Sequence, residues 1–97
     1  MKINEILDKT EILAQLAEEA SELAQAALKL RRAIDGKNPT PKSISICEVQ
    51  LDEEIADVML CIEELGFCEN VHKDIQGMFM DKKWNRWLSR LHARKDV

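Results

Sequence analysis

Apolar residues recur at steps of three and four between residues 13 and 28, and this spacing limits the chain to one kind of local structure. At about 100° per residue, such a period places the apolar side chains on one side of a helix. Residues 46–65 and 71–93 carry the same period, and no segment alternates as a strand would. The sequence therefore predicts an all-α protein with helices over about 3–34, 46–65 and 71–93.

Residues that begin and end helices divide these segments. Residues 35–43 contain both prolines, which cannot continue a helix, so this stretch is the one clear loop. A break near residues 8–11 is also expected, because a fresh helix can start there. The expected N-terminal caps are Thr10, Ser45 (in a capping box with Glu48) and Asn70, and the expected stops are Gly36 and Gly66.

Length and composition narrow the class of protein further. A chain of 97 residues predicts one domain over 1–97, and so small a chain gains stability by sharing its core with copies of itself. The net charge of −4 disfavours nucleic acid as a partner. No apolar run approaches the roughly 20 residues needed to cross a bilayer. Three cysteines without an apolar leader predict a cytoplasmic protein without a disulfide framework.

Acidic residues form a matching pattern on the first two predicted helices. Glu19 with Glu22, and Glu54 with Asp57, are pairs at i, i+3, so each pair presents two carboxylates from one face. On a helical wheel Glu19 lies ~100° and Glu54 ~70° from the centre of its apolar stripe, at the border of the core. Glu18 lies ~160° away, toward solvent. If the two helices pack antiparallel, four carboxylates converge in one cleft.

Carboxylates held so closely repel one another, and removing them from water is costly unless something pairs them. An oxygen-only set of ligands suits Mg²⁺ or Mn²⁺, which also takes substrate phosphates as ligands. The plainer interpretation is that both acidic faces are simply solvated. A protein with solvated acidic faces would be a non-catalytic helical interaction module or a nucleotide-binding regulatory module. The sequence leaves this alternative open.

A basic stripe on the third predicted helix is the remaining candidate site. Lys83, Arg86 and Arg90 fall within about 60° of one another, on an otherwise acidic protein. Such a stripe can bind phosphate, and it can equally match an acidic partner or the helix C-terminus. Trp84 and Trp87 lie on a separate apolar face and are expected in the core or in a subunit interface.

Three blocks together resemble the MazG-like all-α nucleoside triphosphate pyrophosphohydrolases. They are EEASELAQAALKLRRA (18–33), EEIADVMLCIEEL (53–65) and KKWNRWLSRL (82–91), and the stretch that they span covers most of the chain. The 31 residues between Glu22 and Glu54 are at or past the long end of the family's spacing, because the loop is long. That loop, around 35–45, is either a lid or only a longer connection.

The resemblance implies an antiparallel helical bundle whose core is completed as a homodimer or homotetramer. It implies a hydrolase acting on phosphoric anhydrides, which uses Mg²⁺ (or Mn²⁺ as a substitute) to cleave a nucleoside triphosphate into the monophosphate and pyrophosphate. The residues it implies are Glu19, Glu22, Glu54 and Asp57 as metal ligands, Glu18 and Glu19 as catalytic residues that orient the attacking water, and Lys83 and Arg86 as phosphate contacts.

Overall fold

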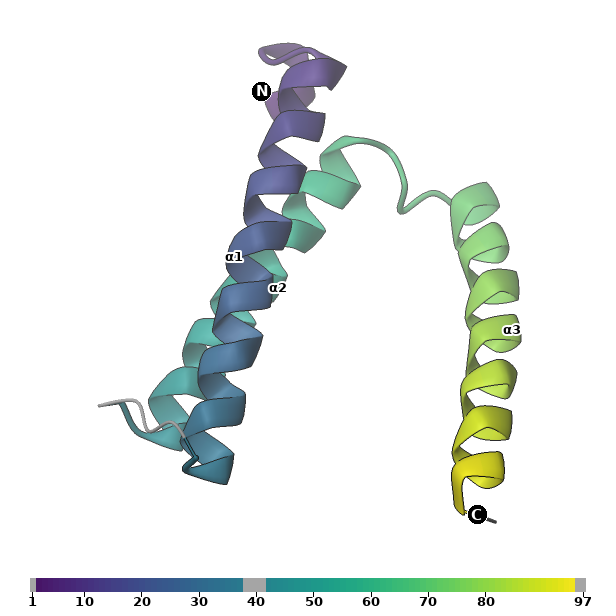
Figure 1. Ribbon diagram of the computed structural model, residues 1–97. Helices are drawn as coiled ribbons and strands as arrows, with labels where there is room; N and C mark the ends of the chain where they lie inside the picture. The colour runs from purple at the N-terminus through teal and green to yellow at the C-terminus, as the bar shows by residue number, and fades with distance from the viewer. Residues whose placement is uncertain (1, 38–41, 96–97) are drawn as a thin grey trace. The chain divides into compact units, whose positions relative to one another are not determined.

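The computed structural model describes residues 2–37 and 42–95, and within them every regular element is helical, which confirms the all-α prediction (Figure 1). A 3₁₀ turn, η1 (Ile3–Glu5), precedes α1 (Lys9–Asp35), α2 (Ile44–Glu64) and α3 (Asn70–Lys95). The chain divides into two compact units, Met1–Gly66 and Phe67–Val97, and each is described by itself.

The expected break before α1 is present, but the cap is Asp8 and the prediction of Thr10 is wrong. The Asp8 carboxylate accepts a 2.9 Å hydrogen bond from the Glu11 N–H, and the Glu11 side chain accepts a 3.2 Å bond from the Asp8 N–H. Thr10 instead donates its hydroxyl proton to Asp8 at 2.6 Å. An aspartate two residues earlier therefore forms a full capping box and lengthens the helix.

The connection between α1 and α2 also differs in detail from the prediction. Gly36 ends α1 as expected, with φ of 67°, and its N–H donates a hydrogen bond to the backbone carbonyl of Arg32. The N-cap of α2 is Ser43, whose hydroxyl accepts from the Ile46 N–H at 3.3 Å, so the capping box predicted from Ser45 is wrong. Ser43 is an equally good cap, and the helix begins two residues earlier than predicted. Residues 38–41 lie outside the described residues, so the lid stays an open question.

Helices α1 and α2 pack side by side as an antiparallel hairpin with a narrow seam (Figure 1). The buried side chains of the seam are Ile12 and Ala26 on α1, and Cys47 and Cys61 on α2. Ile12 and Cys61 line the same cavity. Because each pair is separated by two heptads, the register that places Ile12 near Cys61 also places Ala26 near Cys47.

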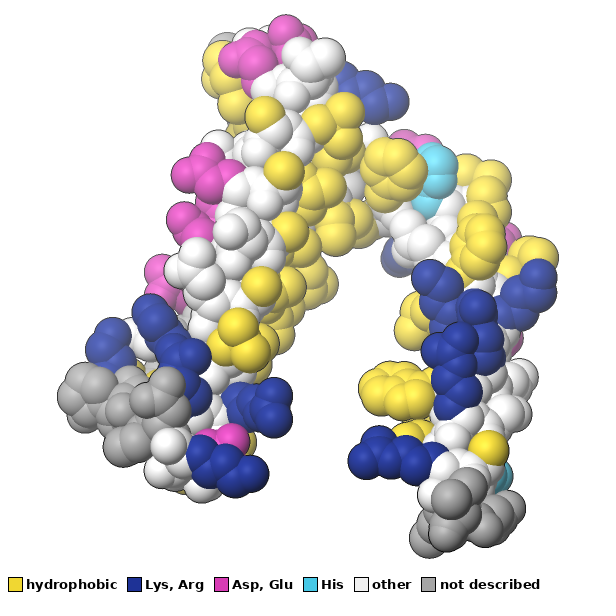
Figure 2. Space-filling view, viewed as in Figure 1, with side chains coloured by type: hydrophobic (Ala, Val, Ile, Leu, Met, Phe, Trp, Pro, Cys, Tyr) yellow, Lys and Arg dark blue, Asp and Glu magenta, His cyan; other side chains and the backbone are white. Residues whose placement is uncertain are grey.

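Part of the apolar stripe of each helix lies outside this seam, on one side of the hairpin. Leu13 and Leu28 on α1 are 44% and 51% exposed, and Met59 on α2 is 61% exposed. Figure 2 shows a hydrophobic band along the hairpin, and acidic side chains on the opposite edge. We define the apolar face by helical spacing, as the apolar residues that share one side of each helix at about 100° per residue: Leu13, Ala17, Ala20, Ala24, Leu28, Leu51, Ile55, Met59 and Ile62.

The second unit consists of a short turn and α3. The amide of Gln76 donates to the Phe67 carbonyl at 3.0 Å, and the rings of Phe67 and His72 lie 4.5 Å apart. The helix begins at Asn70 itself rather than after it, since the Lys73 N–H already bonds to the Glu69 carbonyl at 2.9 Å. Along residues 2–37 and 42–95, no helix has both the length and the apolarity to cross a membrane.

Candidate metal centre

Three of the predicted metal ligands lie together in the middle of the hairpin. Glu19 and Glu22 from α1 and Glu54 from α2 each offer a carboxylate oxygen, and these atoms lie within 4.8 Å of one another. The seam explains this position, because Glu19 is seven residues from both Ile12 and Ala26. Glu54 has the same place midway between the two buried cysteines of α2. A layer of carboxylates thus lies between two layers of buried apolar side chains.

Two oxygen atoms of this acidic triad lack the partners that burial normally demands. Glu19 Oε2 and Glu54 Oε2 are shielded from solvent, and neither accepts a hydrogen bond. A buried carboxylate oxygen with no donor costs free energy, and a bound cation would offset that cost. All the offered atoms are hard oxygens, so the residues present fit Mg²⁺ or Mn²⁺.

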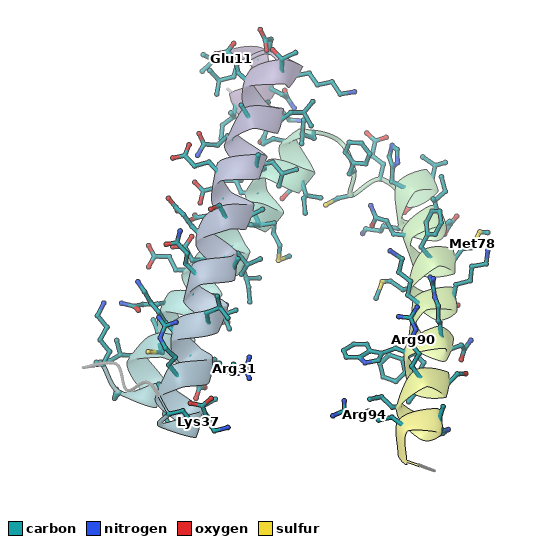
Figure 3. All side chains as sticks on the ribbon, in the orientation of Figure 1. Glu11, Arg31, Lys37, Met78, Arg90 and Arg94 are labelled. Carbon is teal, nitrogen blue, oxygen red and sulfur yellow. The ribbon has the colours of Figure 1, made fainter. Side chains whose placement is uncertain are left out.

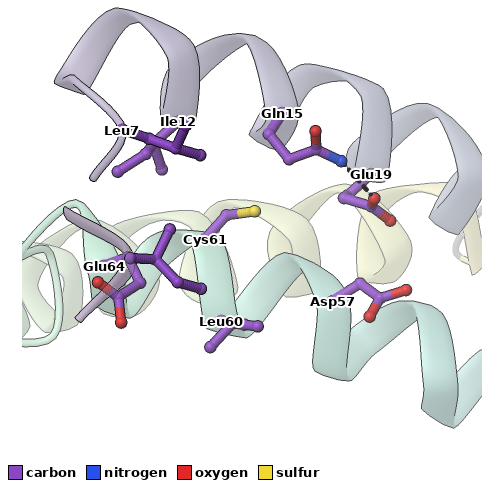
Figure 4. Close-up of a pocket in the computed structure, with 9 residues that line it drawn as sticks. Leu7, Ile12, Gln15, Glu19, Asp57, Leu60, Cys61 and Glu64 are labelled. Atoms are coloured by element: carbon purple, nitrogen blue, oxygen red, sulfur yellow. Dashed lines mark hydrogen bonds between the residues drawn. The ribbon is translucent and has the colours of Figure 1, made fainter. Parts of the chain in front are cut away.

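The other oxygen of Glu19 is held in place. Gln15, one turn earlier on α1, donates its amide proton to Glu19 Oε1 at 2.7 Å (Figure 4). A bond of this kind fixes the carboxylate's orientation before any ligand binds. Gln15 is not among the site residues predicted from the sequence, although glutamine four residues before glutamate is a recognisable helical pair.

The negative charges of the triad act on one another. The pKa of Glu22 is raised above its ordinary value, first by the charge of Glu19, then by the charge of Glu54, and then by desolvation. Glu22 is the exposed member of the triad, and the other two are half-buried. The direction of this shift means that the site favours added positive charge, whether a proton or a metal ion.

The fourth predicted ligand, Asp57, lies outside the triad but close to it. It lines, with Glu19 and Cys61, a cavity of about 250 Å³ whose remaining wall is largely apolar (Figure 4). Burial raises the pKa of the Cys61 thiol, and the charges of Glu19 and Asp57 raise it further, so the thiol stays protonated at neutral pH. Cys61 is a second residue near the site that our sequence analysis left out of it.

The remaining predicted site residues are not members of the triad. Glu18 is exposed on α1, next to Glu19 in sequence. Lys83 and Arg86 are exposed on α3 and belong to the second unit. Their roles therefore stay predictions.

No known protein family, curated protein or solved structure matches this chain. The resemblance to the MazG-like enzymes rests on the sequence blocks quoted above, and it also stays a prediction.

Proposed function

We propose that this chain is a Mg²⁺-dependent nucleoside triphosphate pyrophosphohydrolase, with Mn²⁺ as a possible substitute. The observation that carries the proposal is the pair of solvent-shielded, unpartnered oxygens on Glu19 and Glu54. They belong to two different helices and lie in one acidic triad with Glu22. This is the arrangement that the resemblance to MazG-like enzymes implies for a metal centre.

The residues have distinct roles in the proposed reaction. Glu19, Glu22 and Glu54 hold the metal, and Asp57 completes the ligand set from the neighbouring turn of α2. When bound, Mg²⁺ supplies a Lewis acid that withdraws charge from a phosphoryl oxygen and lowers the pKa of water. In the reaction, water forms a bond to the α phosphorus, and the bond from that phosphorus to the bridging oxygen breaks, releasing pyrophosphate.

Further roles in this reaction fall to Glu18, to Glu19 in addition to its role as a ligand, and to the basic residues of α3. Glu18 and Glu19 orient the attacking water and accept its proton. Lys83 and Arg86 neutralise charge on the leaving pyrophosphate. We place the enzyme in the reducing cytoplasm, where cysteines normally stay free.

We infer further that the apolar face packs against the same face of a second copy, giving a MazG-like bundle as a homodimer or a homotetramer. Helices α1 and α2 have 27 and 21 residues, so the face is roughly 30 Å long and roughly 20 Å wide. It therefore covers roughly 600 Å² on each copy, near the ~800 Å² that each partner buries in a standard interface.

Pyrophosphate release from a panel of ribo- and deoxyribonucleoside triphosphates tests the reaction, with Mg²⁺, with Mn²⁺ and with chelator. Glu54→Gln removes one charge from the triad, and Glu63→Gln makes the same change at an exposed position on α2. We expect release that needs metal, disappears in the first variant and continues in the second.

Two results contradict the proposal. Metal and nucleotide binding without release from any substrate supports a nucleotide-binding regulatory module instead. The absence of both metal binding and release, from folded protein, supports a helical interaction module. Either result leaves the described fold unchanged.

A further inference from the structure

A second cavity adjoins the acidic triad, on the side toward the end of the hairpin where α1 ends and α2 begins. Its volume is about 400 Å³. Glu22 and Glu54 of the triad line it at one end together with Glu53, the residue before Glu54 on α2, and Lys29 and Lys42 also belong to its lining. None of the roles assigned above uses these two lysines.

The charges along this cavity are separated. Lys29 follows Glu22 by seven residues on α1, which is about 10 Å along the helix axis. Lys42 directly precedes Ser43, the N-cap of α2. Lys and Arg side chains gather at this end of the hairpin (Figure 2), and Arg31 and Lys37 mark its position (Figure 3). The cavity therefore runs from carboxylates to ammonium groups.

In the described part of the chain, the two lysines of the cavity form no ion pair with its carboxylates. Within residues 2–37 and 42–95 the salt bridge present is Arg31 with Asp35, at 3.8 Å, and neither lysine of the cavity takes part in one. The first turn of α2 contains no acidic residue, and a helix N-terminus carries partial positive charge. The amides of Gln25 and Gln50, from α1 and α2, also line the cavity and offer hydrogen-bond donors.

We propose that this cavity binds the phosphate chain of a metal-complexed oligophosphate, with its terminal phosphates on Lys29 and Lys42. A ligand that carries a cation at one point and negative charge beyond it matches a cavity that is acidic at one end and basic at the other. This proposal rests on the proposed function in one respect, namely that the acidic triad binds the metal ion of this ligand. In this proposal the hairpin binds both the metal and the leaving phosphates with residues of the first unit alone. Contacts from Lys83 and Arg86 of α3 would be additional.

Calorimetric titration of the full chain with inorganic triphosphate and Mg²⁺ tests this site. We expect the double variant Lys29→Gln, Lys42→Gln to weaken binding by about a hundredfold, since a charge-assisted hydrogen bond is worth about tenfold in affinity. The double arginine variant should stay within a few-fold of the wild type, because it keeps both charges. Lys9→Gln, at the other end of α1, should have no effect.

Three outcomes overturn the site: no binding of triphosphate by the wild type, equal binding by the double glutamine variant, or an equal loss in Lys9→Gln. A circular dichroism melt of the double glutamine variant confirms that it is folded. Pyrophosphate release by the same variants separates this proposal from the previous one. Binding that depends on the lysines, in a protein that releases no pyrophosphate, supports the site and contradicts the reaction. Pyrophosphate release with an unchanged KM in the double glutamine variant supports the reaction and contradicts the lysine site.

Discussion

The Gln15 amide donates to Glu19 Oε1 at 2.7 Å, while Oε2 of the same carboxylate is shielded from water and accepts no hydrogen bond. One oxygen is therefore fixed by a neighbour on α1, and the other is left for a ligand. Metal-binding carboxylates are commonly oriented in this way, by a hydrogen bond from a group that does not itself contact the ion.

Replacing Gln15 with alanine should weaken Mg²⁺ and Mn²⁺ binding by about tenfold, because loss of such a supporting bond usually costs 10–100-fold in metal affinity. The helix should persist, since alanine is the best helix former. Isothermal titration with Mn²⁺ measures the change, with Ser21→Ala as an exposed control on α1. Unchanged affinity in Gln15→Ala would show that Glu19 does not need this bond.

Glu54→Gln should raise the melting temperature of the metal-free protein. The change removes one of three mutually repelling charges while keeping the shape of the side chain. A gain of about 1 kcal/mol corresponds to roughly 4–8 °C in a domain of this size. The same variant should lose the stabilisation that saturating Mg²⁺ gives the wild type.

Circular dichroism melts in chelator and in excess Mg²⁺ test this prediction, and Glu63→Gln should behave as the wild type in both. A lower melting temperature for metal-free Glu54→Gln would mean that the carboxylate already has a stabilising partner in the apo protein.

The raised pKa of Glu22 predicts a pH-dependent penalty in the metal-free protein. Since the folded state binds this proton more tightly than the unfolded state, its contribution to stability falls as pH rises from the ordinary value of 4.5 through the raised value. Glu22→Gln should therefore match the wild type in melting temperature below pH 4.5 and exceed it near neutrality. A constant difference between the two proteins across this pH range would contradict the shift.

Ile55→Glu should disrupt self-association, because it places a charge in the middle of the apolar face. We expect a dissociation constant for the oligomer at least 100-fold higher, measured by sedimentation equilibrium. Val49→Glu is the matched control: Val49 is 67% exposed on α2 and lies about 120° from Ile55 around the helix, outside the apolar face. Equal association by both variants would place the interface elsewhere.

Much of the fold could be predicted from the sequence, because helices depend on local signals. The period of apolar residues gave all three helices, and Gly36 ended α1 as expected. The errors were in N-terminal caps, where Asp8 and Ser43 acted in place of Thr10 and Ser45. Each observed cap lies two residues before the predicted one, and either residue of each pair has the chemistry to cap a helix.

The site was harder to predict, for a geometric reason. The wheel placed Glu19 about 100° from the apolar centre of α1, at a border, whereas the structure places it in the seam with α2. The apolar stripe is wide because it includes the apolar face as well as the seam, and the sequence does not say which part meets α2. The seven-residue spacing of Ile12, Glu19 and Ala26 marks the side of α1 that meets α2. The spacing of Cys47, Glu54 and Cys61 marks the matching side of α2.

The matched heptads of the seam also restrict how the length of this chain can vary. Deleting one residue between Ile12 and Ala26 would rotate Glu19 about 100° relative to one of its two apolar neighbours. The same holds for a deletion on α2 between Cys47 and Cys61. A substitution on these two helices changes one side chain and leaves the others in place. An insertion or deletion there would rotate the carboxylates out of the seam relative to the buried residues on one side of the change.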